Sequence, residues 1–171
     1  MVKISDYIES NTDDYSNIVL TLSEWWGEED YGYKKIYVFY NGNVLLEERN
    51  IVIKENGTKE EIINNKNVTI LDKNELTCLK NIIEFINTNF TEHETPMICD
   101  YGVEVIINCG SLNICIENEI NLYRQLINIL NIFIEKNKTN CEINYSSIEK
   151  EFIKEYLSEL NNTHIVDDSK L

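Results

Sequence analysis

Few residues of this sequence are of the types that catalyse reactions or bind transition metals, since it contains two histidines and five cysteines. His93 and Cys99 lie close together, and Cys109 follows further along the chain. A specific zinc site pairs ligands about two to four residues apart, and a cysteine nucleophile needs a base that a third group orients. These residues show neither arrangement. We therefore expect no catalytic residue, no metal site and no enzymatic activity.

The sequence also lacks the patterns that bind nucleotides or calcium. None of its six glycines stands in a G-x-x-x-x-G-K or G-x-G-x-x-G arrangement, whose backbone would hold phosphate groups. Glu28, Glu29 and Asp30 are consecutive, so their side chains point in different directions and lack the alternating ligands of a calcium loop. We therefore expect no cofactor.

An aromatic and acidic segment remains as the first candidate binding site. Trp25, Trp26 and Tyr31 flank the three acids Glu28 to Asp30. Aromatic rings supply contact area in a protein interface, and carboxylates accelerate the approach of a basic partner. The alternative is that at least one tryptophan belongs to the core, because adjacent residues of a strand face opposite ways. The three acids would then form only a solvated turn.

The net charge of −15 is the strongest global property, with 30 acidic against 15 basic residues. Residues 1–30 contain eight acids and one lysine, residues 81–123 contain seven acids and no base, and residues 31–80 are almost neutral. Direct binding to nucleic acid requires clustered lysine and arginine, so this balance argues against it. Two local negative surfaces are expected instead.

The second acidic segment contains Glu92, Glu94 and Asp100 and surrounds the single proline. Acids that imitate the phosphates of a nucleic acid must share one surface. We therefore predict that some of these residues lie on the same side of the fold as Glu28, Glu29 and Asp30.

Alternating apolar residues predict a mostly antiparallel sheet of five to seven strands, built from residues 17–71 and 103–117. Asn41-Gly42 predicts a type I′ hairpin turn. Apolar residues at helical spacing predict helices at about 74–87 and 119–136 and a final amphipathic helix. Strands followed by helices, without regular alternation, indicate an α+β fold with two or three helices on one face.

Several residues are expected to begin helices. Asp72 and Glu75 have the spacing of a capping box, as do Ser146 and Glu149, and Asn118 precedes the helix at 119–136. A short helical segment is expected within the first ten residues, and the tail from about 161 is expected to fray.

A second candidate surface follows one side of the helix at 119–136. Asn121, Gln125 and Asn128 form a polar but uncharged stripe. Such groups cost less to desolvate than charges, so this stripe is a candidate oligomer or partner face. The alternative is a helix buried on most sides, in a chain whose composition is rich in asparagine.

Length and cysteine number bear on domain organisation and location. A chain of 171 residues is expected to form one domain with its own core. The odd number of cysteines, without close pairs, indicates reduced and mostly buried thiols. No signal sequence or membrane span is recognisable, so we expect a cytoplasmic protein.

These observations favour a small acidic inhibitor, such as an immunity protein or a phage-type anti-defence protein. It would mask the basic, nucleic-acid-binding surface of a partner protein such as a nuclease. The alternatives are a homo-oligomeric adaptor domain, which would be a homodimer in its simplest form, and a small-ligand-binding regulatory domain.

Overall fold

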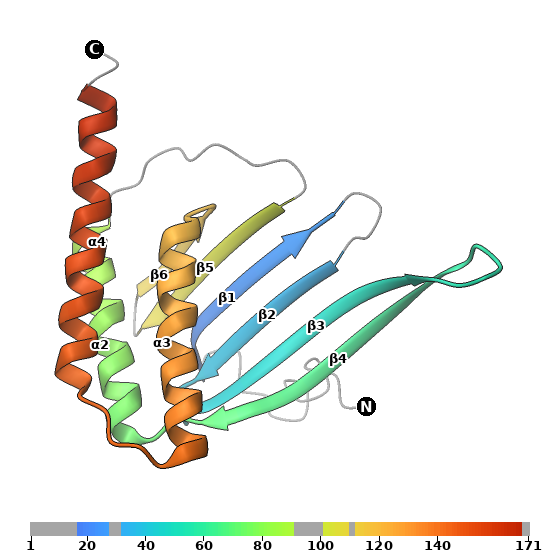
Figure 1. Cartoon of the computed structure of the whole chain (residues 1–171), viewed down its shortest axis with the longest axis horizontal. Coiled ribbons are helices and arrows are strands. Elements are labelled where there is room, and N and C mark those ends of the chain that lie inside the picture. Colours follow the sequence, from blue (N-terminus) through green and yellow to red (C-terminus); the bar gives the residue numbers. More distant parts are fainter. Residues whose placement is uncertain (1–16, 28–31, 91–100, 110–111, 169–171) are drawn as a thin grey trace.

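A computed structural model describes residues 17–27, 32–90, 101–109 and 112–168. Their architecture is one six-stranded sheet with helices gathered on one side of it (Figure 1). All neighbouring strands are antiparallel, in the order β4-β3-β2-β1-β5-β6. The strands are β1 (Ile18–Trp26), β2 (Gly32–Phe39), β3 (Asn43–Ile53), β4 (Lys59–Ile70), β5 (Tyr101–Cys109) and β6 (Leu112–Glu117). The predicted α+β fold is confirmed.

Strand β1 lies between β2 and β5, and its successive side chains alternate between the two faces of the sheet. Leu20 and Leu22 are fully buried and face the helices, next to Val38 and Ile36 of β2 and Val105 of β5. This side of the sheet is called the helix face. Residues of the other parity, such as Thr21 and Ser23, lie on the opposite face.

The β2–β3 and β3–β4 hairpin turns share one hydrogen-bond pattern and one glycine conformation. The Gly42 amide donates to the Phe39 carbonyl at 2.9 Å, and the Gly57 amide donates to the Lys54 carbonyl at 2.9 Å. Both glycines have positive φ, whereas Asn41 does not. Each turn is therefore a three-residue loop that ends in a left-handed glycine. The predicted type I′ turn is wrong, because only one of its two central residues adopts positive φ.

The helices are α2 (Lys73–Asn89), α3 (Ile120–Thr139) and α4 (Tyr145–Asp168). Their apolar stripes pack on the helix face and form one core with it. The fully buried members of that core include Leu79, Ile83, Leu126 and Phe133. Full burial of such side chains contributes about 1.5–3 kcal/mol each relative to exposure.

The predicted helix starts are partly confirmed. Asp72 and Glu75 form the expected capping box. Asn118 does not cap α3, since it has positive φ and its amide donates to the Val103 carbonyl. At the start of α4 the Asn144 side chain accepts from the Ser147 amide at 3.1 Å, so Asn144 takes the role predicted for Ser146. Helix α4 continues to Asp168, past the point from which we expected fraying.

The capping box of α2 belongs to a larger polar cluster. Glu75 has no exposed side-chain surface, and its Oε1 lies 3.5 Å from Nζ of Lys136 on α3. The same ammonium group lies 2.6 Å from Oδ2 of Asp72. Burial raises the pKa of Glu75. Desolvation also acts to raise the pKa of Asp72, but its hydrogen bonds with Lys136 and with the Glu75 backbone outweigh it, and this pKa is lowered. The cluster fixes α2 to α3.

Strands β3 and β4 extend beyond the rest of the sheet. Pairing with β2 ends at Arg49, whereas pairing with β4 continues to Ile53. The resulting two-stranded ribbon projects away from the helices (Figure 1) and exposes 43% of Val52 and 55% of Ile53. Among the described helices, none has the length and apolar character that crossing a bilayer requires.

The three described cysteines are free. Cys78 is buried, whereas Cys115 and Cys141 are exposed, so the prediction of mostly buried thiols is confirmed for only one of these three. Burial, followed by the Glu149 carboxylate, raises the pKa of Cys78 to about 12. Desolvation, followed by Glu104, raises the pKa of Cys115 to about 11. The side chains of Cys99 and Cys109 lie outside the described residues.

We expect iodoacetamide at pH 8 to alkylate Cys141 before Cys78, because the thiolate is the reactive form and Cys78 is both shielded and protonated. Peptide mass spectrometry over a time course measures this order. Alkylation in urea should make the two thiols equally reactive. Equal rates in the native protein would contradict the packing of Cys78.

Candidate functional site

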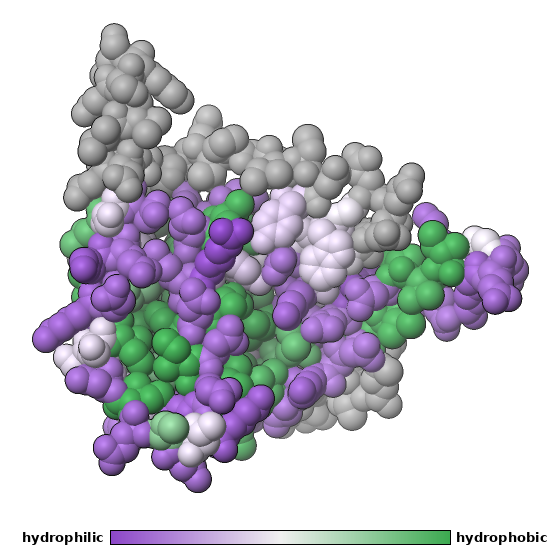
Figure 2. Space-filling model, viewed as in Figure 1, coloured by the Kyte–Doolittle hydropathy of each residue, from purple (hydrophilic) through white to green (hydrophobic). Residues whose placement is uncertain are grey.

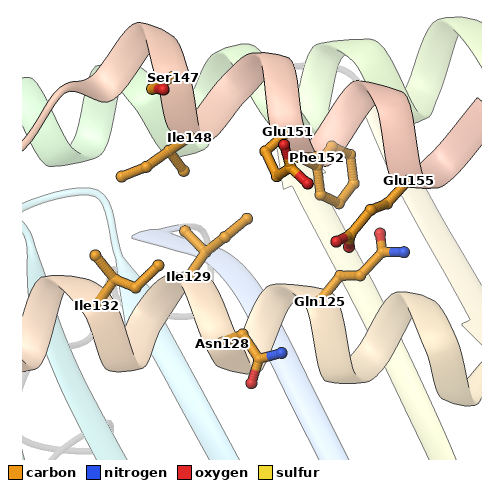
Figure 3. Close-up of a pocket in the computed structure, with 9 residues that line it drawn as sticks. All are labelled: Gln125, Asn128, Ile129, Ile132, Ser147, Ile148, Glu151, Phe152 and Glu155. Carbon is orange, nitrogen blue, oxygen red and sulfur yellow. The ribbon is translucent and has the colours of Figure 1, made fainter.

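A groove with a volume of about 340 Å³ lies between α3 and α4 on the described surface. Figure 3 shows side chains of both helices directed into the space between them. Its lining residues are Gln125, Asn128, Ile129, Ile132, Ser147, Ile148, Glu151, Phe152 and Glu155. The groove therefore contains two residues of the predicted polar stripe and a set of α4 residues that the sequence did not single out.

The floor and one end of the groove are apolar. Ile129 and Phe152 are buried beneath it, and Ile132 remains 43% exposed. Ile148 extends from α4 toward Ile132 and Ile129 of α3 (Figure 3). In the space-filling view, apolar surface is visible in the hollow between the two helices (Figure 2). An exposed large apolar residue beside a concave apolar surface is typical of a protein-binding site.

The rim of the groove on α4 is acidic. Glu151 and Glu155 are exposed and one helical turn apart, so their carboxylates lie on one face of α4. Neither carboxylate forms an ion pair with another described residue. Opposite them, the amide oxygen of Gln125 is buried and has no hydrogen-bond partner within the described part of the chain. Within the described part of the structure, no donor therefore satisfies these acceptors.

The third residue of the predicted stripe has a different role. The Asn121 amide donates to Oε2 of Glu159 at 3.0 Å, which joins α3 to α4 beyond the end of the groove. The stripe is therefore directed toward α4. Asn121 connects the two helices, while Gln125 and Asn128 line the space that remains between them.

The two predicted tryptophans lie on opposite faces of the sheet, as their adjacency in β1 requires. Trp25 lies against Gly102 of β5, where a Cβ atom would be 2.2 Å from the indole ring. Trp26 lies over Gly32 of β2 on the helix face. Both tryptophans are half-buried. Each indole therefore packs over a glycine of the neighbouring strand and keeps some exposed surface.

A carboxylate and two phenols meet beside Trp26. Oε2 of Glu24 accepts the hydroxyl of Tyr123 at 2.9 Å, which connects β1 to α3. Burial and then the hydrogen bond to Glu24 raise the pKa of Tyr123. Burial, followed by the Glu24 charge, also raises the pKa of Tyr101. Both phenols therefore stay protonated at neutral pH, and the cluster orients α3 on the sheet.

The two predicted acidic segments are outside the described part of the structure. Their candidate residues are Glu28, Glu29, Asp30 and the aromatic Tyr31 in one segment and Glu92, Glu94 and Asp100 in the other. Trp26 and Tyr101, which lie near the ends of these segments, are paired across β1 and β5. Whether the two acidic segments share a surface therefore stays a prediction.

One group of described residues has the spacing of metal ligands. One ligand atom from each of Glu104, Cys115 and Glu117 lies within 4.8 Å of the other two. A thiol must lose its proton to bind a metal, and the raised pKa of Cys115 opposes that loss. The group consists of two carboxylates and a thiol on the paired strands β5 and β6 and supports no assignment.

A scan against protein-family models and a search of curated proteins find no match to this chain. The groove and the charge of the chain are therefore the features from which we infer a function.

Sequence reasoning missed the acidic rim because it treated α4 as an isolated amphipathic helix. The i, i+4 spacing of Glu151 and Glu155 was a usable signal, since it places two like charges on one face. Only the position of α4 beside α3 shows that these charges border an apolar groove.

Proposed function

We propose that the protein is a small acidic inhibitor that binds a basic, nucleic-acid-binding surface of a partner protein. The α3–α4 groove is the part of the described surface that makes the contact. The observation that carries this proposal is the combination of an apolar floor with two rim carboxylates that pair with no cation among the described residues.

The chemistry of the groove defines the segment that it would accept. Apolar side chains at i, i+3 and i+4 of a helix would enter the groove, as when an amphipathic helix docks on a helix pair. Lysine or arginine on the next turn would reach Glu151 and Glu155. Recognition would then combine apolar burial with charge-assisted hydrogen bonds.

The overall charge supports a basic partner. A net charge of −15 repels nucleic acid and accelerates encounter with a cationic surface at low ionic strength. A cationic surface that binds nucleic acid would be neutralised by such a protein. The action is one of binding and needs no chemical step.

A defined peptide tests the groove directly. The probe is a fluorescein-labelled helical peptide with leucines on one face and lysines beside them, and its control is a scrambled peptide of equal composition. By fluorescence anisotropy we expect the first peptide to bind at least about tenfold more tightly. The double variant E151K/E155K should weaken this binding by at least about tenfold, with a strong dependence on salt.

The matched control is the double variant E55K/E84K, which makes the same charge change at exposed positions outside the groove lining. It should retain most of the affinity. Equal losses in both variants, or equal binding of the scrambled peptide, would show that diffuse charge is sufficient and would contradict the assigned groove.

The inhibitory role has its own test. Protein isolated from the native host on the wild-type bait and lost with the E151K/E155K bait should be basic and should bind nucleic acid. Addition of the wild-type chain should release that nucleic acid in a mobility-shift titration. A captured partner that holds its nucleic acid equally well with the chain bound would refute inhibition.

A further inference from the structure

The outer edge of β4 is an unpaired sheet edge in the described part of the chain (Figure 1). Strand β4 is 12 residues long and contains no proline. A long edge strand exposes backbone donors and acceptors that pair readily with another strand, and proteins commonly block such edges with charges, prolines or bulges. The charges on β4 therefore decide whether this edge is blocked or can pair.

The charges of β4 are balanced, in contrast to the rest of the chain. Residues 59–67 contain two lysines and two glutamates. The other sheet edge, β6, is six residues long and ends at Glu117, which lies opposite Glu104. The β6 edge therefore offers no self-complementary pair of opposite charges, whereas β4 contains both signs and carries no net charge over residues 59–67.

The order of these charges is self-complementary about Ile63. Glu60 and Lys66 stand three residues to either side of Ile63. In an antiparallel pair, residues directly opposite each other share a face of the sheet. When Ile63 of two copies meets on a two-fold axis, Glu60 of each lies opposite Lys66 of the other. Both side chains point to the helix face, since their β3 neighbours are Val52 and Leu46.

Neighbouring registers lack this match. With Asn64 on the axis, Lys66 would face Ile62 of the second copy. With Ile62 on the axis, Glu61 would face Ile63. Both lose the two symmetry-related ion pairs, and cross-strand pairs of opposite charge stabilise an antiparallel sheet.

The existing contacts of these residues permit the pairing. Glu60 and Lys66 are both exposed. Lys66 forms no ion pair with another described residue, while Glu60 lies 3.2 Å from Lys54 of its own ribbon. A second cation on the other side of the Glu60 carboxylate would extend that pair into a small network.

We propose that two copies of the chain associate through antiparallel pairing of their β4 strands over residues 59–67, with Ile63 on the two-fold axis. The occupant of this edge is a second copy, and the contact makes one continuous twelve-stranded sheet. This surface is separate from the α3–α4 groove and does not depend on the proposed inhibitory function.

A charge exchange tests the pairing. By sedimentation equilibrium we expect the wild type to form a concentration-dependent dimer and E60K or K66E to weaken it at least tenfold, because each places like charges at both symmetry-related positions. The double variant E60K/K66E restores opposite charges and should restore the dimer. A wild type that stays monomeric at 200 µM, or a double variant as weak as the single ones, would overturn the proposal.

Cysteine cross-linking tests the register without relying on stability. Residues directly opposite in an antiparallel pair have Cα atoms about 4.5–5.5 Å apart, within disulfide range. In a C115S/C141S background, I63C should form a disulfide-linked dimer on mild oxidation, and N65C should not, because Glu61 lies opposite it. Equal cross-linking of the two variants would exclude this register. Unchanged melting temperatures would show that each variant is folded.

Discussion

Replacement of Gly42 by alanine should lower the free energy of unfolding by about 3 kcal/mol or more. Gly42 has a φ of 96°, a conformation that costs an L-residue about 1–2 kcal/mol. A Cβ atom there would also lie 2.4 Å from the carbonyl oxygen of Leu71, which is backbone and cannot rotate away. Relief of that contact requires the backbone to shift, a strain of about 1–3 kcal/mol.

Gly42 also links the β2–β3 turn to the start of α2. Its carbonyl accepts the Leu71 amide at 2.8 Å, and Leu71 immediately precedes the cap residue Asp72. A shift at Gly42 should therefore disturb both the hairpin and the helix start. Urea unfolding measures the loss, and the melting temperature should fall by about 6 °C or more.

Gly57→Ala is the matched control for Gly42→Ala. Gly57 occupies the corresponding position of the β3–β4 turn with a φ of 81°, but a Cβ atom there meets nothing within 4 Å. We expect a loss of about 1 kcal/mol from the backbone conformation alone. Similar losses at Gly42 and Gly57 would show that the close approach to Leu71 does not contribute.

Lys136→Met should lower the free energy of unfolding by about 2 kcal/mol at pH 7. It removes the ammonium group that pairs with Asp72 and lies next to the fully buried carboxyl of Glu75. Removal of one partner from a buried ion pair costs about 3–5 kcal/mol. The value here should be smaller because 19% of the Lys136 side chain and 45% of Asp72 are exposed.

The cost of Lys136→Met should depend on pH. The pKa of Glu75 is raised above its ordinary value of 4.5, so Glu75 reduces stability as the pH rises through that value toward the folded pKa. Loss of the cation raises this pKa further and enlarges the reduction at neutral pH. The lowered pKa of Asp72 provides stability above about pH 3.8, and that stability is lost as the pH falls toward the folded pKa. The Glu75 effect of the substitution therefore diminishes toward pH 4, whereas the Asp72 effect diminishes only below about pH 3.8.

Urea unfolding at pH 4, 5.5 and 7 measures this dependence. Lys138→Met is the control, because it removes the same charge from an exposed position in the last turn of α3. Its effect should be small at every pH. A loss at Lys136 that is constant from pH 4 to pH 7 would contradict the coupling to Glu75.

The helices, most strands and the position of the Asn41-Gly42 turn were predictable because they depend on neighbours in the sequence. The capping box of Asp72 and Glu75 is a contact across three residues, and the alternation of Leu20 and Leu22 is a property of one strand. The same locality explains the errors. Asn118 and Ser146 both have side chains that can cap helices. The positive φ of Asn118 excluded it as the cap of α3, and Asn144 caps α4 in place of Ser146.

Residues 60–66 show only a weak strand pattern, because asparagine and charged residues interrupt the alternation of apolar and polar residues. Pairing with β3 along its whole length made them the outer strand of the ribbon. That pairing placed Glu60 and Lys66 on one edge, where their order about Ile63 becomes meaningful. No local pattern contains this information.

The sequence by itself determined the acidic character of the chain, the α+β class and which side of each helix is apolar. Net charge follows directly from composition, and the periodicity of strands and helices follows from the spacing of apolar residues. Tertiary structure alone decided that the stripe of Gln125 and Asn128 faces α4, and that Glu151 and Glu155 border the space between. The physical reason is that a groove exists only between two surfaces. Its shape depends on how α3 and α4 pack on a shared sheet, and their separation leaves Ile132 exposed.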